Sequence, residues 1–415
     1  MEDLKEQYDS LCKEKNVIDL TRGKPSPEQL NLSEMLDGIL DGNFILDGVD
    51  IRNYGEIKGL PSARKLGAEL LDYSEEFILA SSNSSLTLMG NLLSAFLFNG
   101  SGDAPWIELE SISIICPVPG YDRHFAVCEK LGIKMIKVPL IGDGPDMNIV
   151  EDLVKNDESI KGIWCNPKHS NPTGEIYSQD TVKRIANLPL IGTSDFIVLW
   201  DNAYAVHDFT SSKKLSSIQE ISQELNTFDN VATFGSTSKI TFAGGGIAFL
   251  GASDKLMSLF LDYFSKFNFS PDKVNQARHV KFLKNRKGIE AHMKKLAALI
   301  KPKFELVDKY LNSLPEGLAS WTKPTGGYFV SFDSKPGQAS KIFDLCKTAG
   351  LNLTPIGSAF PYRRDQENSN IRIAPTYVSI EELEKAMQIF VCCVKLADEM
   401  AVSYTHLTLP TKRSV

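Results

Sequence analysis

Short runs of apolar residues alternate with amphipathic stretches along the middle of the chain, from about residue 76 to residue 255. Several runs are continuously apolar, such as Ile197–Trp200, which is typical of parallel strands covered on both faces. The expected strands are Phe77–Ala80, Ser113–Cys116, Ile133–Pro139, Gly162–Cys165, Phe196–Trp200, Val231–Phe234 and Gly246–Gly251. The expected helices between them are Leu86–Phe98, His124–Leu131, Met147–Lys155, Thr181–Ala186 and Ser216–Leu225. This alternation predicts an α/β fold with a mostly parallel central sheet covered by helices.

The rest of the chain predicts a second, smaller α/β unit. A long helical stretch from Gly288 to Asn312 is followed by a β–α–β–α pattern over Gly327–Phe332, Ser340–Ala349, Ile371–Ala374 and Ser379–Glu399. We expect a large domain over residues 46–300, a small domain over 301–402, and an N-terminal segment, 1–45, that joins the small domain. Residues 403–415 break the helical pattern and resemble translated adapter sequence, so we expect a non-native tail there.

Composition narrows the class of protein. The chain has 415 residues and a net charge of −7, which argues against a nucleic-acid partner. No apolar run approaches the roughly 20 residues of a membrane span, and the first residues lack a signal-peptide pattern. The seven cysteines form no CxxC motif or His/Cys cluster, so we expect no metal site and free thiols in the cytoplasm.

Four polar segments follow the ends of predicted strands, where ligands bind in open α/β sheets. They are Ser81–Ser85, Asn166–Gly174, Asp201–Tyr204 and Ser236–Lys239. Each has an ordinary explanation when taken alone: helix-capping serines, a turn, a loop acid and a surface lysine. Their order along the chain is what makes them informative.

The residue types also suggest a chemistry. A lysine such as Lys239 can form a Schiff base with a carbonyl cofactor, and serines at a helix start can hold a phosphate. Asp201 could keep a pyridine nitrogen protonated, with Tyr204 on a phenolic oxygen. Ser236 and Lys239 also fit the SxxK spacing of serine β-lactamases, but the SDN and KTG partners are missing. The GxGxxG fingerprint of NAD binding is absent.

Together, the four segments resemble the fold-type-I pyridoxal-phosphate aminotransferases of class I/II. The resemblance spans nearly the whole chain, from Asp19–Pro25 to Asn370–Ala374. Further stretches look like the bacterial subgroup Ic aspartate aminotransferases: Thr21–Pro27, Tyr54–Arg64, Cys116–Phe125, Ser236–Gly244 and Asn275–His279. That branch approaches the catalytic domain of MocR-type regulators, but no helix-turn-helix domain precedes the matching part, so a regulator is not expected.

The resemblance implies a role for each residue that matches the family's motifs. Lys239 would form the Schiff base and move the proton, Asp201 would pair with the pyridinium nitrogen, and Tyr204 would bond the ring hydroxyl. Arg372 would hold the substrate α-carboxylate with its two-pronged guanidinium. The other expected contacts are Ser84, Ser85 and Ser236 on the phosphate, Tyr54 of the neighbouring subunit on the same phosphate, Tyr121 stacked on the ring, Asn171 on the ring hydroxyl and the substrate, and Gly23 beside the substrate.

One position departs from the wider superfamily, which carries a phosphate-binding arginine eight residues after the lysine. Here that position is Ile247. Subgroup Ic resembles this pattern, so another donor is expected to offset the phosphate charge. Arg278 and Asn275 are the two candidates.

The resemblance thus implies a cytoplasmic homodimer that transfers the amino group of L-aspartate to 2-oxoglutarate by a ping-pong mechanism. No residue can be assigned to a distal carboxylate, so alanine, aromatic and kynurenine-type substrates stay open. A non-catalytic sensor that binds pyridoxal phosphate is a second class of function, which the presence of Lys239, Asp201 and Arg372 disfavours. A lyase or decarboxylase on the same fold is the third.

Overall fold

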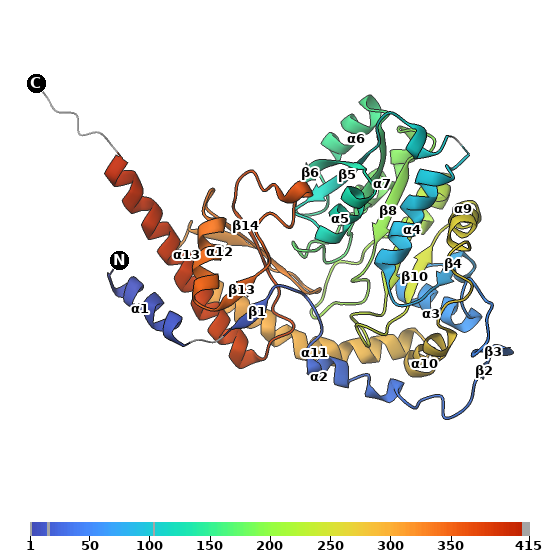
Figure 1. Ribbon diagram of the computed structural model, residues 1–415, viewed down its shortest axis with the longest axis horizontal. Coiled ribbons are helices and arrows are strands. Elements are labelled where there is room, and N and C mark those ends of the chain that lie inside the picture. Colours follow the sequence, from blue (N-terminus) through green and yellow to red (C-terminus); the bar gives the residue numbers. More distant parts are fainter. Residues whose placement is uncertain (1, 15–16, 103, 409–415) are drawn as a thin grey trace, which may run out of the picture.

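A computed structural model describes residues 2–14, 17–102 and 104–408 of the chain. The fold is α/β, as predicted, with a large unit built on one central sheet and a smaller unit beside it (Figure 1). Within the described ranges, no helix combines the length and the hydropathy that a membrane span requires.

The central sheet has seven strands in the order β4-β10-β9-β8-β7-β5-β6. Only β10 runs antiparallel to its neighbours, which the apolar runs did not predict because they carry no information on direction. The strands are β4 (Ile78–Ala80), β5 (Ser113–Val118), β6 (Lys134–Pro139), β7 (Ile160–Cys165), β8 (Ile197–Asp201), β9 (Val231–Ser236) and β10 (Ala248–Gly251).

Alternate residues of the central strands β5, β7, β8 and β9 enter two separate apolar cores, which explains why these runs are apolar throughout. Leu199 and Phe234 face one core, whereas Val198 and Trp200 face the other. The first core is closed by α4 (Ser85–Phe98), α5 (Asp122–Lys130) and α9 (Asp254–Phe264). The second is closed by α6 (Met147–Asn156), α7 (Gln179–Asn187) and α8 (Ile218–Glu224).

The small unit combines both ends of the chain. Its antiparallel sheet has the order β11-β12-β14, and β1 pairs in parallel with β13. These strands are β1 (Ile18–Leu20), β11 (Ala319–Trp321), β12 (Val330–Ser334), β13 (Leu351–Leu353) and β14 (Asn370–Ile373). Three helices complete it: α1 (Glu2–Lys13), α12 (Ala339–Thr348) and α13 (Ile380–Thr408). In Figure 1, α1 lies beside α13.

The N-terminal segment packs first on the small unit and then on the large one. Tyr8 and Leu20 pack in the core of the small unit, whereas Leu40 packs in the core of the large one. This segment contains α2 (Pro27–Asn31) and the short hairpin β2 (Ile45–Leu46) and β3 (Val49–Asp50) before it enters α3 (Pro61–Leu71). The domain boundary at residue 45 therefore stays a prediction.

Helix α11 (Arg286–Leu311), which follows α10 (Lys273–Leu283), runs along both units (Figure 1). Met293 packs on the large unit, and Phe304 packs on the small one. At the other end of the chain, α13 continues to Thr408, so the predicted break in the helical pattern at residue 403 is wrong. Residues 409–415 of the predicted non-native tail lie outside the described residues.

Candidate functional site

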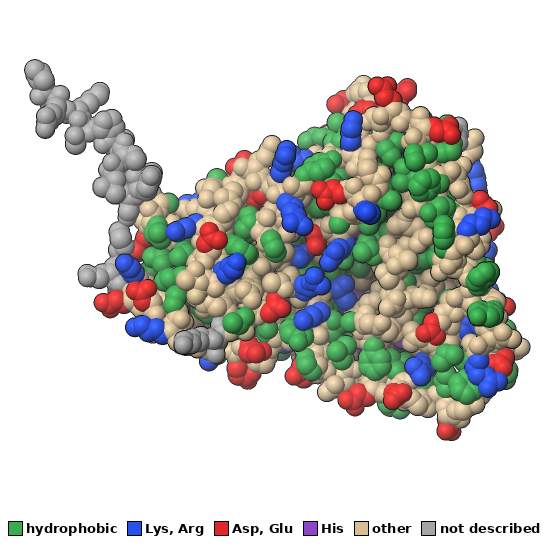
Figure 2. All heavy atoms as spheres, in the orientation of Figure 1, with side chains coloured by type: hydrophobic (Ala, Val, Ile, Leu, Met, Phe, Trp, Pro, Cys, Tyr) green, Lys and Arg blue, Asp and Glu red, His purple; other side chains and the backbone are tan. Residues whose placement is uncertain are grey.

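The carboxyl ends of the parallel strands face a pocket of about 520 Å³ between the two units. On the face shown in Figure 2, Lys and Arg side chains gather around a hollow between the units. Six of the residues singled out from the sequence line this pocket: Gly23, Tyr121, Asn171, Tyr204, Lys239 and Arg372. Segments that lie far apart in the sequence thus meet at one place, as ligand sites at strand ends require.

Asp201, the last residue of β8, is buried beside this pocket. Its Oδ2 lies 2.9 Å from Nε2 of His124, whose ring stacks on Trp164 at 4.1 Å between centroids. Its Oδ1 has no hydrogen-bond partner within the described chain. A buried carboxylate with one free oxygen is costly unless a cationic or N–H donor completes it. The site therefore calls for a donor at this position.

His124 was missing from the residues that the sequence singled out. It lies within the stretch Cys116–Phe125, which carried part of the resemblance, but it belongs to helix α5 and approaches Asp201 only in the folded chain.

Lys239 lies three residues beyond the end of β9, with its Nζ 5.1 Å from the ring centroid of Tyr204. Burial lowers the pKa of the Lys239 amine; the nearby Asp201 opposes this shift, and Arg372 adds to it. The backbone carbonyl of Lys239 accepts a hydrogen bond of 3.3 Å from the Tyr328 hydroxyl, and Nε2 of His207 lies 3.3 Å from the same oxygen. A lowered pKa favours the neutral amine, which is the nucleophilic form.

Tyr204 is buried in the same pocket. Burial raises the pKa of its hydroxyl well above the ordinary value, and the neighbouring Tyr121 and Asp201 raise it further. The hydroxyl therefore stays protonated and can donate a hydrogen bond to an oxygen of a bound molecule.

Arg372 reaches the pocket from β14 in the small unit and is 8% exposed. Its Nη1 donates to Oδ1 of Asp122 at 3.1 Å and to Oδ1 of Asn171 at 3.2 Å. Its Nε is buried with no partner in the described chain. Because the guanidinium keeps an unused donor in a pocket, it can bind a carboxylate there.

The residues around the Arg372 guanidinium are closely packed and hydrogen-bonded. The Arg372 group lies over the ring of Phe329, 4.9 Å from its centroid. Gly23 passes so close to the same ring that an added Cβ would lie 2.4 Å from one of its atoms, so only glycine fits there. Asn171 is fixed by Asn166, whose Oδ1 accepts from the Asn171 N–H at 2.7 Å and whose Nδ2 donates to the Asp201 carbonyl at 2.7 Å. Phe329 was not singled out from the sequence, and Asn166 was named there only as part of the segment Asn166–Gly174, without a role of its own.

Ser84, Ser85 and Ser236 do not line the pocket wall. Ser84 is the N-cap of α4 and Ser85 its first residue, and the loop before α4 contacts the segment after β9. Within this contact, Ser238 Oγ donates to the Asn83 carbonyl at 3.2 Å, and Asn83 Nδ2 donates to the Gly244 carbonyl at 2.9 Å. Ser84 and Ser85 therefore lie at a helix N-terminus, a position that suits a phosphate, whereas Ser236 ends strand β9.

The position of the absent arginine is occupied by the core. Ile247 is fully buried and packs with the residues around α3. Asn275 uses both hydrogens of its amide group on the carbonyls of Gly245 and Gly246, at 2.8 and 2.9 Å. Asn275 therefore holds the glycine-rich loop and is wrong as a phosphate donor, which leaves Arg278 as the candidate.

Tyr54 lies apart from the pocket, with 83% of its surface exposed. The loop around it is anchored on α10, because Lys273 Nζ donates to the carbonyls of Asn53 and Gly55 at 2.7 and 3.0 Å. The side chain therefore projects from a held backbone, and its predicted contact with a neighbouring subunit stays a prediction.

The donor set fits the predicted pyridoxal phosphate. The free oxygen of Asp201 can accept a hydrogen bond from a protonated ring nitrogen, and Tyr204 can donate one to a ring hydroxyl. Lys239 supplies an amine in the same pocket. The serines at the start of α4 and beside β9 offer donors for the phosphate.

Comparisons with known proteins show which family the chain resembles. The sequence profile of a family described as aspartate amino-transferase matches residues 1–406. The chain is 43% identical to an aspartate aminotransferase of Corynebacterium glutamicum, over 95% of this chain and 93% of that one. The solved structure of an aspartate transaminase from that organism superposes with a TM-score of 0.93 at 41% identity, covering 96% of each chain. The α-aminoadipate aminotransferase of Thermus thermophilus shares the fold, with a TM-score of 0.78 at 20% identity over 95% of each chain.

Proposed function

Because this chain belongs to the aspartate aminotransferase family and is an aminotransferase, we propose that it transfers the amino group of L-aspartate to 2-oxoglutarate with bound pyridoxal phosphate. The observation that carries the proposal is the unpartnered Oδ1 of Asp201 at one side of a pocket that also holds Lys239 and Arg372. A protonated pyridine nitrogen would complete that carboxylate.

The residues of the chain divide the work. The cofactor, when bound, supplies the electron-withdrawing ring that allows the Cα–H bond of an amino acid to break. Arg372 binds and orients the α-carboxylate, and the neutral amine of Lys239 takes and returns the proton at Cα. Asp201 keeps the ring nitrogen protonated, and His124 holds the Asp201 carboxylate in place.

The mouth of the pocket supports a substrate with a second carboxylate. Arg22, Arg123 and Arg363 all line the pocket, and each is exposed. None of them forms an ion pair with a carboxylate of the described residues, so their charges are available to a ligand. An acidic side chain would gain from them, whereas alanine or an aromatic side chain would not.

The absorption spectrum of the protein with bound pyridoxal phosphate tests the proposal. We expect L-aspartate to bleach the visible band of the bound cofactor and 2-oxoglutarate to restore it, since each half-reaction changes the cofactor. L-alanine at the same concentration is the control for the distal carboxylate and should act much more slowly.

The other outcomes separate the alternatives. If only L-alanine or an aromatic amino acid bleaches the band, that amino acid is the substrate in place of L-aspartate. Ammonia or carbon dioxide released without a keto acid would indicate a lyase or decarboxylase. A stable band that no amino acid changes would favour the non-catalytic sensor.

We also propose a homodimer, because Tyr54 is exposed on an anchored loop and fits a contact with the neighbouring subunit's phosphate site. The seven cysteines are all free thiols, and we therefore place the protein in the cytoplasm.

A further inference from the structure

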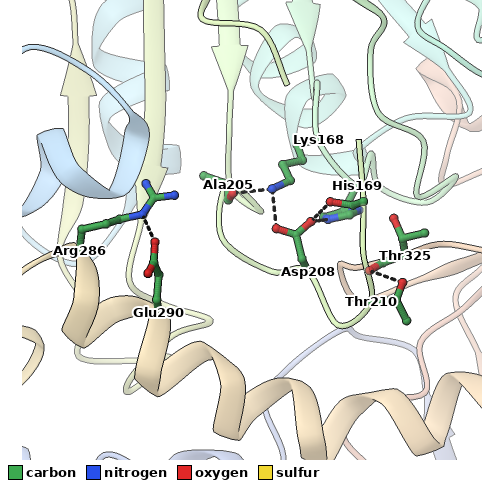
Figure 3. Close-up of polar contacts among 9 residues, drawn as sticks. Lys168, His169, Ala205, Asp208, Thr210, Arg286, Glu290 and Thr325 are labelled. Carbon is green, nitrogen blue, oxygen red and sulfur yellow. Dashed lines mark hydrogen bonds and ion pairs between the residues drawn. The ribbon is translucent and has the colours of Figure 1, made fainter. Parts of the chain in front are cut away.

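A second cavity, of about 310 Å³, shares no lining residue with the catalytic pocket. It lies between the end of α3, the strands β8 and β9, the loop of residues 212–217 and the start of α11. Its volume is at the lower end of the range found for small-molecule sites. Figure 3 shows three residues of its wall, Lys168, Asp208 and Arg286, together with Glu290, the ion-pair partner of Arg286.

Buried polar groups form the wall of this cavity. Lys168 is 9% exposed, and its Nζ donates to the Ala205 carbonyl at 2.9 Å and to Oδ2 of Asp208 at 2.7 Å (Figure 3). Asn202 is 7% exposed, yet its Oδ1 has no hydrogen-bond partner in the described chain, whereas the buried Thr233 hydroxyl can pair with the neighbouring Tyr73 hydroxyl. An unsatisfied buried acceptor such as the Asn202 Oδ1 is costly, so it calls for a donor-bearing molecule.

The charges of the cavity do not cancel. Asp208 is neutralised by Lys168 and approached by His169, whose Nε2 lies 2.9 Å from Oδ1. Arg286, also a residue of the wall, is paired with Glu290, which is not, at 2.9 Å between Nε and Oε1 (Figure 3). The remaining charged residues of the wall are Asp72 and the exposed lysines 213 and 214, which form no ion pair within the described residues. The wall therefore keeps an excess of positive charge in a chain whose net charge is −7.

We propose that this cavity binds a small hydroxylated phosphate monoester of the sugar-phosphate class. The excess of lysine charge suits a phosphate, which carries up to two negative charges. The hydroxyl groups of such a molecule donate to Asn202 Oδ1 and exchange hydrogen bonds with Ser216 of the wall. A purely apolar ligand would leave the polar and charged groups of the wall without partners, so it gains little there.

This cavity is distinct from the pocket in which transamination is proposed, and the inference does not rest on the proposed substrates. Titration calorimetry of the protein saturated with pyridoxal phosphate tests it, because the cofactor occupies its own phosphate site throughout. The probe is sorbitol 6-phosphate, which has no aldehyde to react with lysines. Sorbitol and inorganic phosphate, titrated separately, are the controls for the hydroxylated part and the phosphate part of the probe.

The variant Lys213→Gln/Lys214→Gln removes two exposed charges from the cavity, and Lys341→Gln/Lys347→Gln removes two exposed charges from α12. We expect the probe to bind the native protein and the α12 variant with the same Kd. The cavity variant should bind about tenfold more weakly, as the loss of charge-assisted hydrogen bonds to phosphate predicts.

Each other result overturns the proposal. Equal weakening in both double variants would show that net charge alone attracts the probe. If the probe binds the native protein and the cavity variant with equal affinity, it binds outside this cavity. If inorganic phosphate binds as tightly as sorbitol 6-phosphate, the hydroxyl groups of the probe contribute nothing to binding. If millimolar sorbitol 6-phosphate gives no heat of binding, the cavity does not bind this class of molecule.

Discussion

At the scale of single residues, the His124 side chain decides how well Asp201 is held. The imidazole bonds one carboxylate oxygen at 2.9 Å and is itself fixed by stacking on Trp164. In the variant His124→Phe the stacking is kept and the hydrogen bond is lost. We expect the Kd for pyridoxal phosphate to rise roughly tenfold, because a hydrogen bond to a charged group contributes about 1.5–3 kcal/mol. Absorbance titration of the cofactor measures this, and an unchanged Kd would show that Asp201 needs no such support.

Glu175 gives the fold a dependence on pH. Burial raises the pKa of its carboxyl from 4.5 to about 7, although the Gly144 N–H donates to it. A raised folded pKa means that the stability contributed by the protonated group is complete below pH 4.5 and is lost as the pH rises through 7. The variant Glu175→Gln stays neutral and keeps the acceptor for Gly144. Its free energy of unfolding in urea should exceed that of the native protein at pH 8 and match it at pH 4.5; equal values at both pH values would contradict this.

At the scale of elements, helix α10 holds a loop of the proposed cofactor site through Asn275. Asn275 ties the helix to Gly245 and Gly246, next to the segment that carries Lys239. The variant Asn275→Ala frees this loop, and we expect it to weaken pyridoxal-phosphate binding several-fold while the large unit stays folded. Arg278→Ala, on the same helix, is the comparison. A larger loss in Arg278→Ala would identify the phosphate donor, and native affinity in Asn275→Ala would mean that the loop needs no anchor.

Most strands of the central sheet were predictable because both of their faces are buried, which leaves an apolar run in the sequence; the edge strand β6, with Lys134 and Lys137 exposed, is the exception. Helix α10 was not predicted, for the opposite reason. Its buried face carries Lys273, Gln276 and His279, which bond to backbone and hydroxyl groups, so it has no apolar stripe at helical spacing.

Some residues of the site were predictable from the sequence, and others were not. Asp201, Asn171 and Lys239 were predictable because polar residues at the ends of parallel strands converge at one edge of the sheet. The contact of His124 with Asp201 was not, because a side chain on α5 reaches that edge only through the packing of its helix.

At the scale of the whole molecule, the proposed dimer predicts that two chains share each catalytic site. We expect hybrids of Lys239→Ala and Tyr54→Phe chains, co-expressed with different tags, to contain one site with a native lysine and a native tyrosine. At a cofactor concentration that leaves the Tyr54→Phe homodimer mostly empty, the hybrid should keep up to about half of the native activity per dimer, because one of its two sites is intact. A hybrid no more active than the Tyr54→Phe protein would show that Tyr54 does not act across the interface.

The parallel pairing of β1 with β13 sets an order of events on the ribosome. Ile18 pairs with Leu351, so β1 leaves the exit tunnel long before the ribosome has synthesised its partner strand β13. The central sheet, by contrast, has all of its strands once Gly251 has been translated. The large unit can therefore begin to fold during synthesis, whereas Tyr8 and Leu20 stay exposed until synthesis is nearly complete. The residues that are made first in the small unit are thus the ones that a chaperone would have to shield the longest.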